Sequence, residues 1–245
     1  HQATILFAWR NVTLASALLA LLMAVLVFLY VRDDPSEKGL KSYLDKESSG
    51  QKEEKILKSL GRVFRFSNTW FLTIAPGGIV GAVLTFSGLW GVPFLTEVYH
   101  LENATAATLC SLVMLAWALS GPIYSLVSER IKLRRMPYLI GTMISLISWS
   151  LVFLIPGWSL GVLSLLLFLA GFFSGGMILG FAQGKETLPL SLSGTVSGVI
   201  NMGVLTGPML LQPLVGFLLD STKPTAHTSK EIAVGFSFKD YRFAF

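Results

Sequence analysis

Long stretches of this sequence carry no charged side chain. Asp, Glu, Lys, Arg and His are all absent from residues 11–31, 66–96, 103–128, 136–184 and 187–219. A helix that crosses a lipid bilayer needs about 20 mostly apolar residues, and each stretch is long enough. Only 13% of the residues are charged, compared with about 25% in soluble domains. We therefore predict an all-α, polytopic membrane protein built as a helical bundle.

The uncharged stretches contain six predicted spans, because a turn at residues 155–158 divides the longest stretch. That turn reads Ile-Pro-Gly-Trp, and Pro and Gly both interrupt helices. The predicted spans are residues 11–31, 68–96, 104–128, 136–155, 159–184 and 190–219. A further apolar segment begins at Tyr241, and the first residue is His1 instead of Met. We therefore expect a fragment of a longer protein, with six complete transmembrane helices and the start of a seventh.

Residues 32–67 form the one long polar segment between the predicted spans, and we expect a solvated linker there. Apolar side chains recur at helical spacing within residues 56–64, with lysines and arginines between them. This pattern predicts an amphipathic helix, which lies either on a membrane surface or against the ends of neighbouring helices. The excess of Lys and Arg places the linker and the loop 129–136 on the cytoplasmic side. The bases of residues 221–242 would lie on the other side and count against this orientation.

The composition excludes several classes of protein. The net charge is +5, but the bases lie in loops between apolar spans, so we expect no nucleic-acid partner. The three histidines occupy terminal or loop positions, and the sequence has no Ser/His/Asp group, Cys/His metal spacing or phosphate-binding loop. We therefore predict no enzyme activity, no metal and no cofactor. The single cysteine, Cys110, lies in an apolar span and is expected to be a buried packing residue.

Glycines recur at four-residue spacing in the fifth and sixth predicted spans. The sets are Gly171 and Gly175; Gly176, Gly180 and Gly184; Gly194 and Gly198; and Gly203 and Gly207. Small residues at this spacing let transmembrane helices approach one another closely. Two interpretations stay open, namely static close packing and a surface on which helices slide.

Neutral polar and aromatic side chains near the middle of the predicted spans are the candidates for solute contact. They are Thr85, Trp117, Ser174 and Asn201. No ionisable residue lies inside a predicted span, so the sequence indicates no proton relay and no ion-selective ring. A polar group buried in a membrane needs a hydrogen-bonding partner. That partner is either a neighbouring helix or a bound solute, and both interpretations stay open.

A cluster of charge separates the third predicted span from the fourth. Its members are Glu129, Arg130, Lys132, Arg134 and Arg135, and Gly121 precedes them in the same segment. Residues 121–137 resemble the signature loop of the major facilitator superfamily, which reads roughly Gly-x-x-x-Gly-x-x-x-Asp-Arg-x-Gly-Arg-Arg-Lys. Gly121, Arg130, Arg134 and Arg135 fit that pattern, whereas Ser125 and Glu129 stand where Gly and Asp are usual.

The resemblance implies the major facilitator fold of two six-helix halves. The superfamily carries the loop after its second helix and a looser copy after its eighth, and the looser form fits here. Residues 1–31 then correspond to the last helix of the N-terminal half, and residues 32–67 to the cytoplasmic central linker. Residues 68–245 correspond to helices 7 to 11 and the start of helix 12. Residues 89–95 and 212–220 resemble helices 7 and 11 of the bacterial organic-anion and sugar-phosphate permeases.

The function that the resemblance implies is secondary active transport of a small organic solute by alternating access. The solute would be an organic anion, a sugar derivative or a metabolite, bound near mid-membrane between the halves. A gating loop is implied at Gly121, Glu129, Arg130, Arg134 and Arg135. The implied partners are the lipid bilayer of a bacterial inner membrane, the missing N-terminal half, and a coupling proton or sodium ion.

One departure from the superfamily limits the expected solute. Its organophosphate antiporters clamp phosphate with a basic residue in helix 7, and no base occurs between Arg65 and Glu97 here. This half is therefore expected to recognise its solute by hydrogen bonds and stacking. A transporter-like membrane sensor, or a seven-helix receptor without transport, is the alternative that the sequence leaves open.

Overall fold

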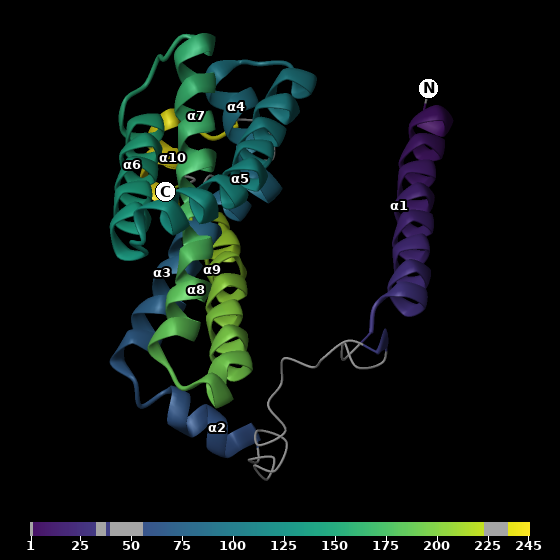
Figure 1. Cartoon of the computed structure of the whole chain (residues 1–245). Coiled ribbons are helices and arrows are strands. Elements are labelled where there is room, and N and C mark those ends of the chain that lie inside the picture. The colour runs from purple at the N-terminus through teal and green to yellow at the C-terminus, as the bar shows by residue number, and fades with distance from the viewer. Residues whose placement is uncertain (1, 33–37, 40–55, 223–234) are drawn as a thin grey trace. The chain divides into compact units, whose positions relative to one another are not determined.

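A computed structural model describes residues 2–32, 38–39, 56–222 and 235–245 of the chain (Figure 1). The regular elements of these residues are all helical, as the sequence predicts. The chain divides into two compact units, residues 1–54 and residues 55–245. Most of the central linker, residues 40–55, lies outside the described residues.

The first unit contributes one helix, α1, which runs from Gln2 to Tyr30. Its segment Arg10–Tyr30 is long and apolar enough to cross a membrane. Every described side chain of this segment is exposed within the unit, including Leu18, Val25 and Phe28. A helix that is apolar on all faces requires a membrane or a protein core around it, so α1 has the character of a transmembrane helix.

The second unit contains the remaining helices, several of them continuous across short 3-10 or π segments. They are α2 Ile56–Val63, α3 Ser67–Thr85, the π-helix η3 Phe86–Trp90, α4 Gly91–Tyr99, α5 Asn103–Ile131, α6 Arg135–Leu154, α7 Leu160–Ser174, η4 Gly175–Met177, α8 Ile178–Thr187, η5 Leu190–Leu192, α9 Ser193–Thr222 and α10 Phe238–Ala244. Six helices within the described residues, α1 included, can cross a membrane by length and composition. Their bounds lie within a few residues of the six predicted spans.

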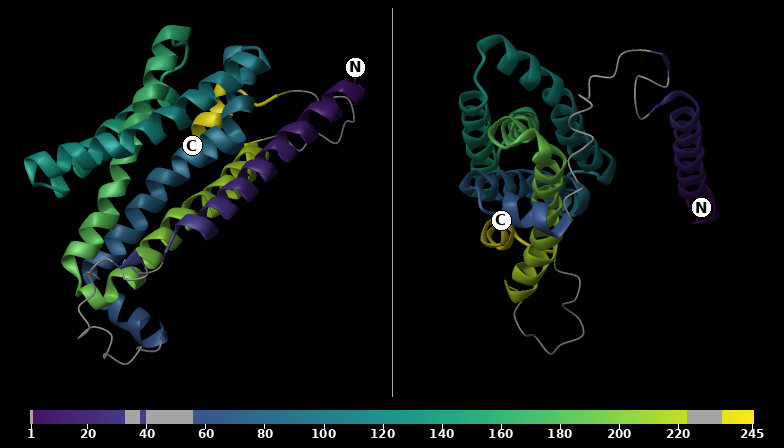
Figure 2. Two further views of the ribbon diagram at one scale, coloured as in Figure 1. Left: turned by 45° about the vertical axis from the view of Figure 1, so that its right-hand side comes forward. Right: turned by 60° about the horizontal axis from the view of Figure 1, so that its bottom comes forward.

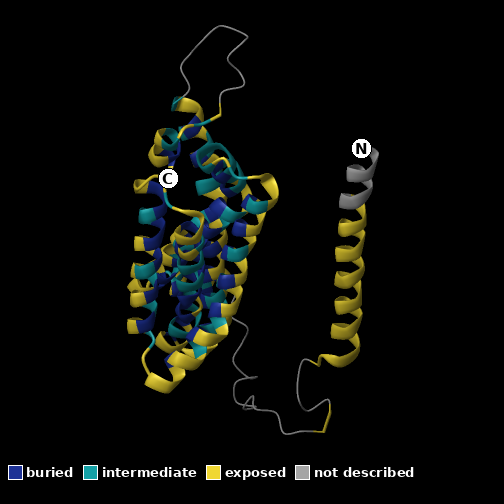
Figure 3. Ribbon diagram, turned by 90° about the horizontal axis from the view of Figure 1, so that it is seen from above, coloured by how far each residue is buried: buried dark blue, intermediate teal, exposed yellow. Residues whose placement is uncertain are grey.

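Two groups of helices build the bundle of the second unit (Figure 2). The helices α3 and α9 run side by side and share the most extensive contact, while α7 packs between α5 and α6. Buried residues gather inside the bundle and exposed ones cover its outer faces (Figure 3). Many of the exposed side chains are large and apolar, such as Leu115, Leu146 and Phe217. A surface of this kind is suited to lipid and not to water.

Aromatic rings form the centre of the larger hydrophobic core. Phe86 packs against Trp149 and Phe94 with ring centroids 5.1 Å and 6.0 Å apart, and Phe153 contacts all three of these rings. This cluster joins the π segment to α4 and α6, and it also includes Cys110, which is buried as predicted. Aromatic pairs in such geometries add about 0.5–1.5 kcal/mol each beyond the area that they bury.

The helix α2 packs on the ends of other helices. Its Val63 is fully buried in a second core with Leu72, Leu192 and Ile200, whereas Ile56 and Leu57 are exposed. The structure thus supports the second of the two interpretations of the amphipathic segment, and it leaves the first turn of α2 with an apolar surface.

Candidate functional site

The basic loop between α5 and α6 is held by a small set of polar contacts. The helix α5 ends because Lys132 adopts a left-handed backbone conformation, with φ of 54°. The buried Ser128 hydroxyl donates to the Leu133 carbonyl at 2.7 Å and accepts from the Arg134 guanidinium at 3.1 Å. The chain is therefore fixed in the turn that leads into α6.

Arg134 also joins this loop to the far end of α8. Its Nε atom donates a hydrogen bond to one carboxylate oxygen of Glu186 at 3.1 Å, and its Nη2 atom lies 3.0 Å from the same oxygen in an ion pair. The two side chains are 27% and 51% exposed, so water screens part of their attraction. Glu186 lies between the fifth and sixth predicted spans, which puts it on the same side of the predicted bundle as the basic loop. That shared side is the sequence signal for this pair.

The other charges of the loop behave differently. Glu129, Arg130 and Arg135 are exposed, and no ion pair joins them to a described residue. Gly121 has open space around the position of a Cβ atom. The loop therefore consists of one arginine that is bound inside the second unit and four exposed charged side chains, since Lys132 is exposed as well.

The four solute candidates do not form one cluster. Ser174 is fully buried, and its hydroxyl donates to the Ala170 carbonyl at 2.7 Å and lies 2.9 Å from the Ser145 hydroxyl. Trp117 is half-buried against the aromatic core. The Ser174 hydroxyl is therefore occupied by hydrogen bonds within and between α6 and α7. This matches the interpretation in which the partner of a buried polar group is a neighbouring helix and not a bound solute.

Thr85 and Asn201 differ from Ser174 because neither side chain has a hydrogen-bonding partner among the described residues. Thr85 is 1% exposed, and its hydroxyl lies at the last turn of α3, directly before the π segment. Asn201 is exposed on α9, about a third of the way along the span Leu190–Thr222. An amide on the surface of a transmembrane helix is unfavourable in hydrocarbon, so the position of Asn201 calls for a polar partner.

Sequence reasoning missed how the π segment is held. The Gln212 side-chain amide donates to the Leu84 carbonyl at 3.2 Å, and the Trp90 indole donates to the Gln212 carbonyl at 3.0 Å. A π turn leaves backbone carbonyls without their usual helical donors, and Gln212 supplies one. The π segment Phe86–Trp90 therefore lies directly beside this contact with α9.

Glycine pairs bring α3 and α9 together. A Cβ atom on Gly203 would lie 2.1 Å from the Thr73 carbonyl oxygen, and one on Gly207 would lie 1.8 Å from that of Gly77. Gly171 approaches Val113 in the same way, with 2.4 Å to its carbonyl oxygen. In contrast, Gly194 and Gly198 face open space. Close packing therefore explains part of the glycine pattern.

The search for metal sites within the described parts of the chain finds no group of three or more His, Cys, Asp or Glu side chains. The site is thus a set of neutral polar groups within the spans and a charged loop at one end of the bundle. Such an arrangement offers hydrogen-bonding groups within the spans and charge at one end of the bundle.

A comparison with protein families decides which class of membrane protein this is. The model of the Major Facilitator Superfamily matches residues 3–221. The chain belongs to the Major Facilitator Superfamily. This superfamily member is an integral multi-pass membrane protein and a membrane transporter. A search of curated proteins gives no match to it.

Proposed function

We propose that this protein is a secondary active transporter that moves a small organic solute by alternating access. In that mechanism two groups of helices rock about a site near the membrane midplane, which opens to one side at a time. Membership of the superfamily supports transport. The observation that carries the mechanism is the division of the loop between one bound arginine and exposed charges that form no ion pair with a described residue.

Rigid-body motion gives those two sets of charges different roles. A contact inside one rigid group persists while the group rotates, so the pair of Arg134 and Glu186 holds the shape of its own unit in both states. Glu129, Arg130 and Arg135 are exposed and are free to meet another surface in one state and leave it in the other. We therefore assign gating to Glu129 and its two neighbours, with Gly121 leaving room for close approach.

We propose that the solute binds near mid-membrane, with Thr85, Trp117, Ser174 and Asn201 as the candidate contacts. Because these four do not form one cluster, one small solute would contact only some of them at a time. Asn201 is the leading candidate, because its amide is exposed and can both donate and accept hydrogen bonds. Thr85 adds a hydroxyl that has no partner in the described structure. Ser174 would contribute only if its bond to Ala170 were exchanged for one to solute.

The predicted spans contain no Asp, Glu, Lys, Arg or His, so this unit would recognise its solute by neutral hydrogen bonds and stacking. Hydrogen bonding and stacking suit an organic anion, a sugar derivative or another small metabolite, and the resemblance of residues 89–95 and 212–220 supports the organic-anion and sugar-phosphate permease branch. No base lies between Arg65 and Glu97, so this unit supplies no phosphate clamp from that helix. A proton or a sodium ion would provide the coupling.

The location and the division of the chain complete the proposal. We assign the protein to a bacterial inner membrane, with the linker 32–67 and the loop 129–136 on the cytoplasmic side, because these segments carry the excess of bases. Residues 1–31 would then be the last helix of the first half, and residues 68–245 would belong to the second half.

Uptake by reconstituted protein tests the proposed function. Proteoliposomes that contain the full-length protein would be given a panel of labelled organic acids and sugar derivatives, with and without proton or sodium gradients. We expect saturable accumulation of at least one solute, driven by a gradient. Specific solute binding without flux under any gradient would instead favour a transporter-like sensor.

A further inference from the structure

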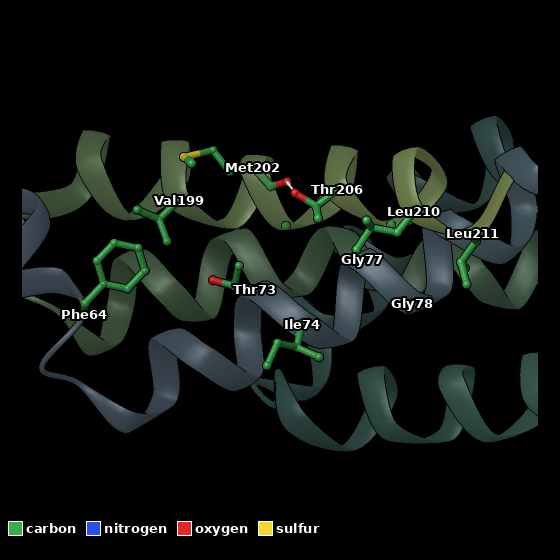
Figure 4. A pocket seen from close by; sticks show the side chains of 12 residues that line it. Phe64, Thr73, Ile74, Gly77, Gly78, Val199, Met202, Thr206, Leu210 and Leu211 are labelled. Atoms are coloured by element: carbon green, nitrogen blue, oxygen red, sulfur yellow. Dashed lines mark hydrogen bonds between the residues drawn. The ribbon is translucent and has the colours of Figure 1, made fainter. Parts of the chain in front are cut away.

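An apolar groove of about 430 Å³ runs between α3 and α9, within the second unit (Figure 4). Phe64 lies at one end of the groove and Leu211 at the other, and Ile74 and Met202 line its walls. Along α9 the groove extends from Val199 to Leu211, which is roughly 18 Å at 1.5 Å per residue. The hydrocarbon of one leaflet is about 15 Å thick, half of the bilayer core.

The polar atoms of the groove are already satisfied. Its side-chain hydroxyls belong to Thr73 and Thr206, which donate to the carbonyls of Thr69 and Met202 at 2.7 Å each. The rest of the lining consists of glycines and apolar side chains. A polar solute would find no free donor side chain here, whereas a hydrocarbon chain would lose nothing by entering.

Charge and aromatic residues mark the Phe64 end of the groove as the membrane interface. The Trp70 indole donates to the Phe64 carbonyl at 3.1 Å and its ring is 51% exposed, and Trp is typical of the headgroup level. Arg65, which follows Phe64, is exposed and has no ion-pair partner in the described structure. Residues 56–96 contain Lys58, Arg62 and Arg65 and no acidic residue.

We propose that the groove holds an acyl chain of an anionic phospholipid, with the phosphate beside Arg65. The groove is about as long as an acyl chain in one leaflet, and its apolar lining suits the hydrocarbon of that chain. The positive charge at one end suits the anionic phosphate. The lipid would stabilise the contact of α3 with α9 and tie the first turn of the span Ser67–Tyr99 to the headgroup layer.

Native mass spectrometry of the full-length protein with added dioleoyl phosphatidylglycerol or phosphatidylcholine tests this proposal, and its readout is binding, independent of transport. We expect phosphatidylglycerol to bind the more tightly, and Arg65→Gln to weaken it about fivefold while sparing phosphatidylcholine. Gly78→Leu should abolish binding of both lipids, because Gly78 lines the groove and has open space for a side chain. Gly161→Leu is the matched control, since Gly161 on α7 also faces open space.

Photo-crosslinking of the wild-type protein provides a second measurement that depends on no variant. Phosphatidylglycerol with a diazirine on its acyl chain should label peptides that contain Ile74 and Met202. The proposal is wrong if labelling avoids these peptides, which would mean that another helix or a second copy of the chain covers the groove. Equal affinity for the two lipids, or unchanged binding by Gly78→Leu, would also overturn it.

Discussion

The Arg134 guanidinium donates a hydrogen bond from Nε to one carboxylate oxygen of Glu186, a residue 52 positions further along the chain, and its Nη2 atom forms an ion pair with the same oxygen. This contact joins the start of α6 to the end of α8 within one unit. The acid of the loop itself, Glu129, takes no part in it. The loop therefore contains one ion pair within the unit and other charges that remain available to another surface.

The ion pair of Arg134 with Glu186 is expected to contribute little to the free energy of unfolding. Since the two side chains are 27% and 51% exposed, a double-mutant cycle of Arg134→Gln and Glu186→Gln should give a coupling of about 0.2–1 kcal/mol. Reversible unfolding in detergent would measure it. Glu129→Gln serves as the control and should leave the free energy of unfolding unchanged, because Glu129 has no described partner. A coupling well above this range would mean that the pair is a principal support of the fold.

The contact between α3 and α9 is predicted to depend on glycine. Gly207→Ala would place a Cβ atom 1.8 Å from the Gly77 carbonyl oxygen, so the helices must separate, at a cost of about 1–3 kcal/mol. Gly198→Ala on the same helix faces open space and should stabilise the protein by about 0.4–1 kcal/mol through the gain in helix propensity. Both changes gain the same helix propensity, so the difference between their unfolding free energies isolates the steric effect. Equal effects would show that the helices do not pack as described.

The positions of the spans could be predicted because lack of charge over a span length has one physical explanation. Residues 104–128 are the predicted span and Asn103–Ile131 is the helix; the small excess is Asn103 at one end and residues 129–131 at the other, where the charged Glu129 and Arg130 end the uncharged stretch. The burial of Cys110 followed for the same reason. The span positions and the burial of Cys110 depend only on whether lipid or water surrounds the segment.

Side-chain partners could not be predicted, because they depend on how helices rotate against one another. Nothing in the pattern around Ser174 distinguishes a hydroxyl that points at Ser145 from one that points at a solute. Likewise, Gln212 meets Leu84 only because the π segment rotates the end of α3 and frees that carbonyl. Such details require the packing of the second unit.

The π segment should lose stability when its polar contact with α9 is removed. Gln212→Met keeps the length of the side chain but leaves the Leu84 carbonyl without its donor. We expect a loss of about 0.6–1 kcal/mol, typical of a hydrogen bond between transmembrane helices. Thermal unfolding in detergent measures this loss, with the exposed Leu214→Met on the same helix as the control. If the two variants unfold alike, this hydrogen bond does not stabilise the π segment.

Exchange of labelled solute across proteoliposomes, for the wild-type protein and for Glu129→Gln, tests the proposed mechanism most directly. If Glu129 changes partners between the two states, its replacement by Gln should slow exchange by about tenfold, equivalent to roughly 1.4 kcal/mol of barrier, and leave solute affinity unchanged. Glu102→Gln, at the other end of α5, should exchange as fast as the wild-type protein. Exchange by Glu129→Gln at the wild-type rate and with normal expression would contradict the assignment of gating to this loop.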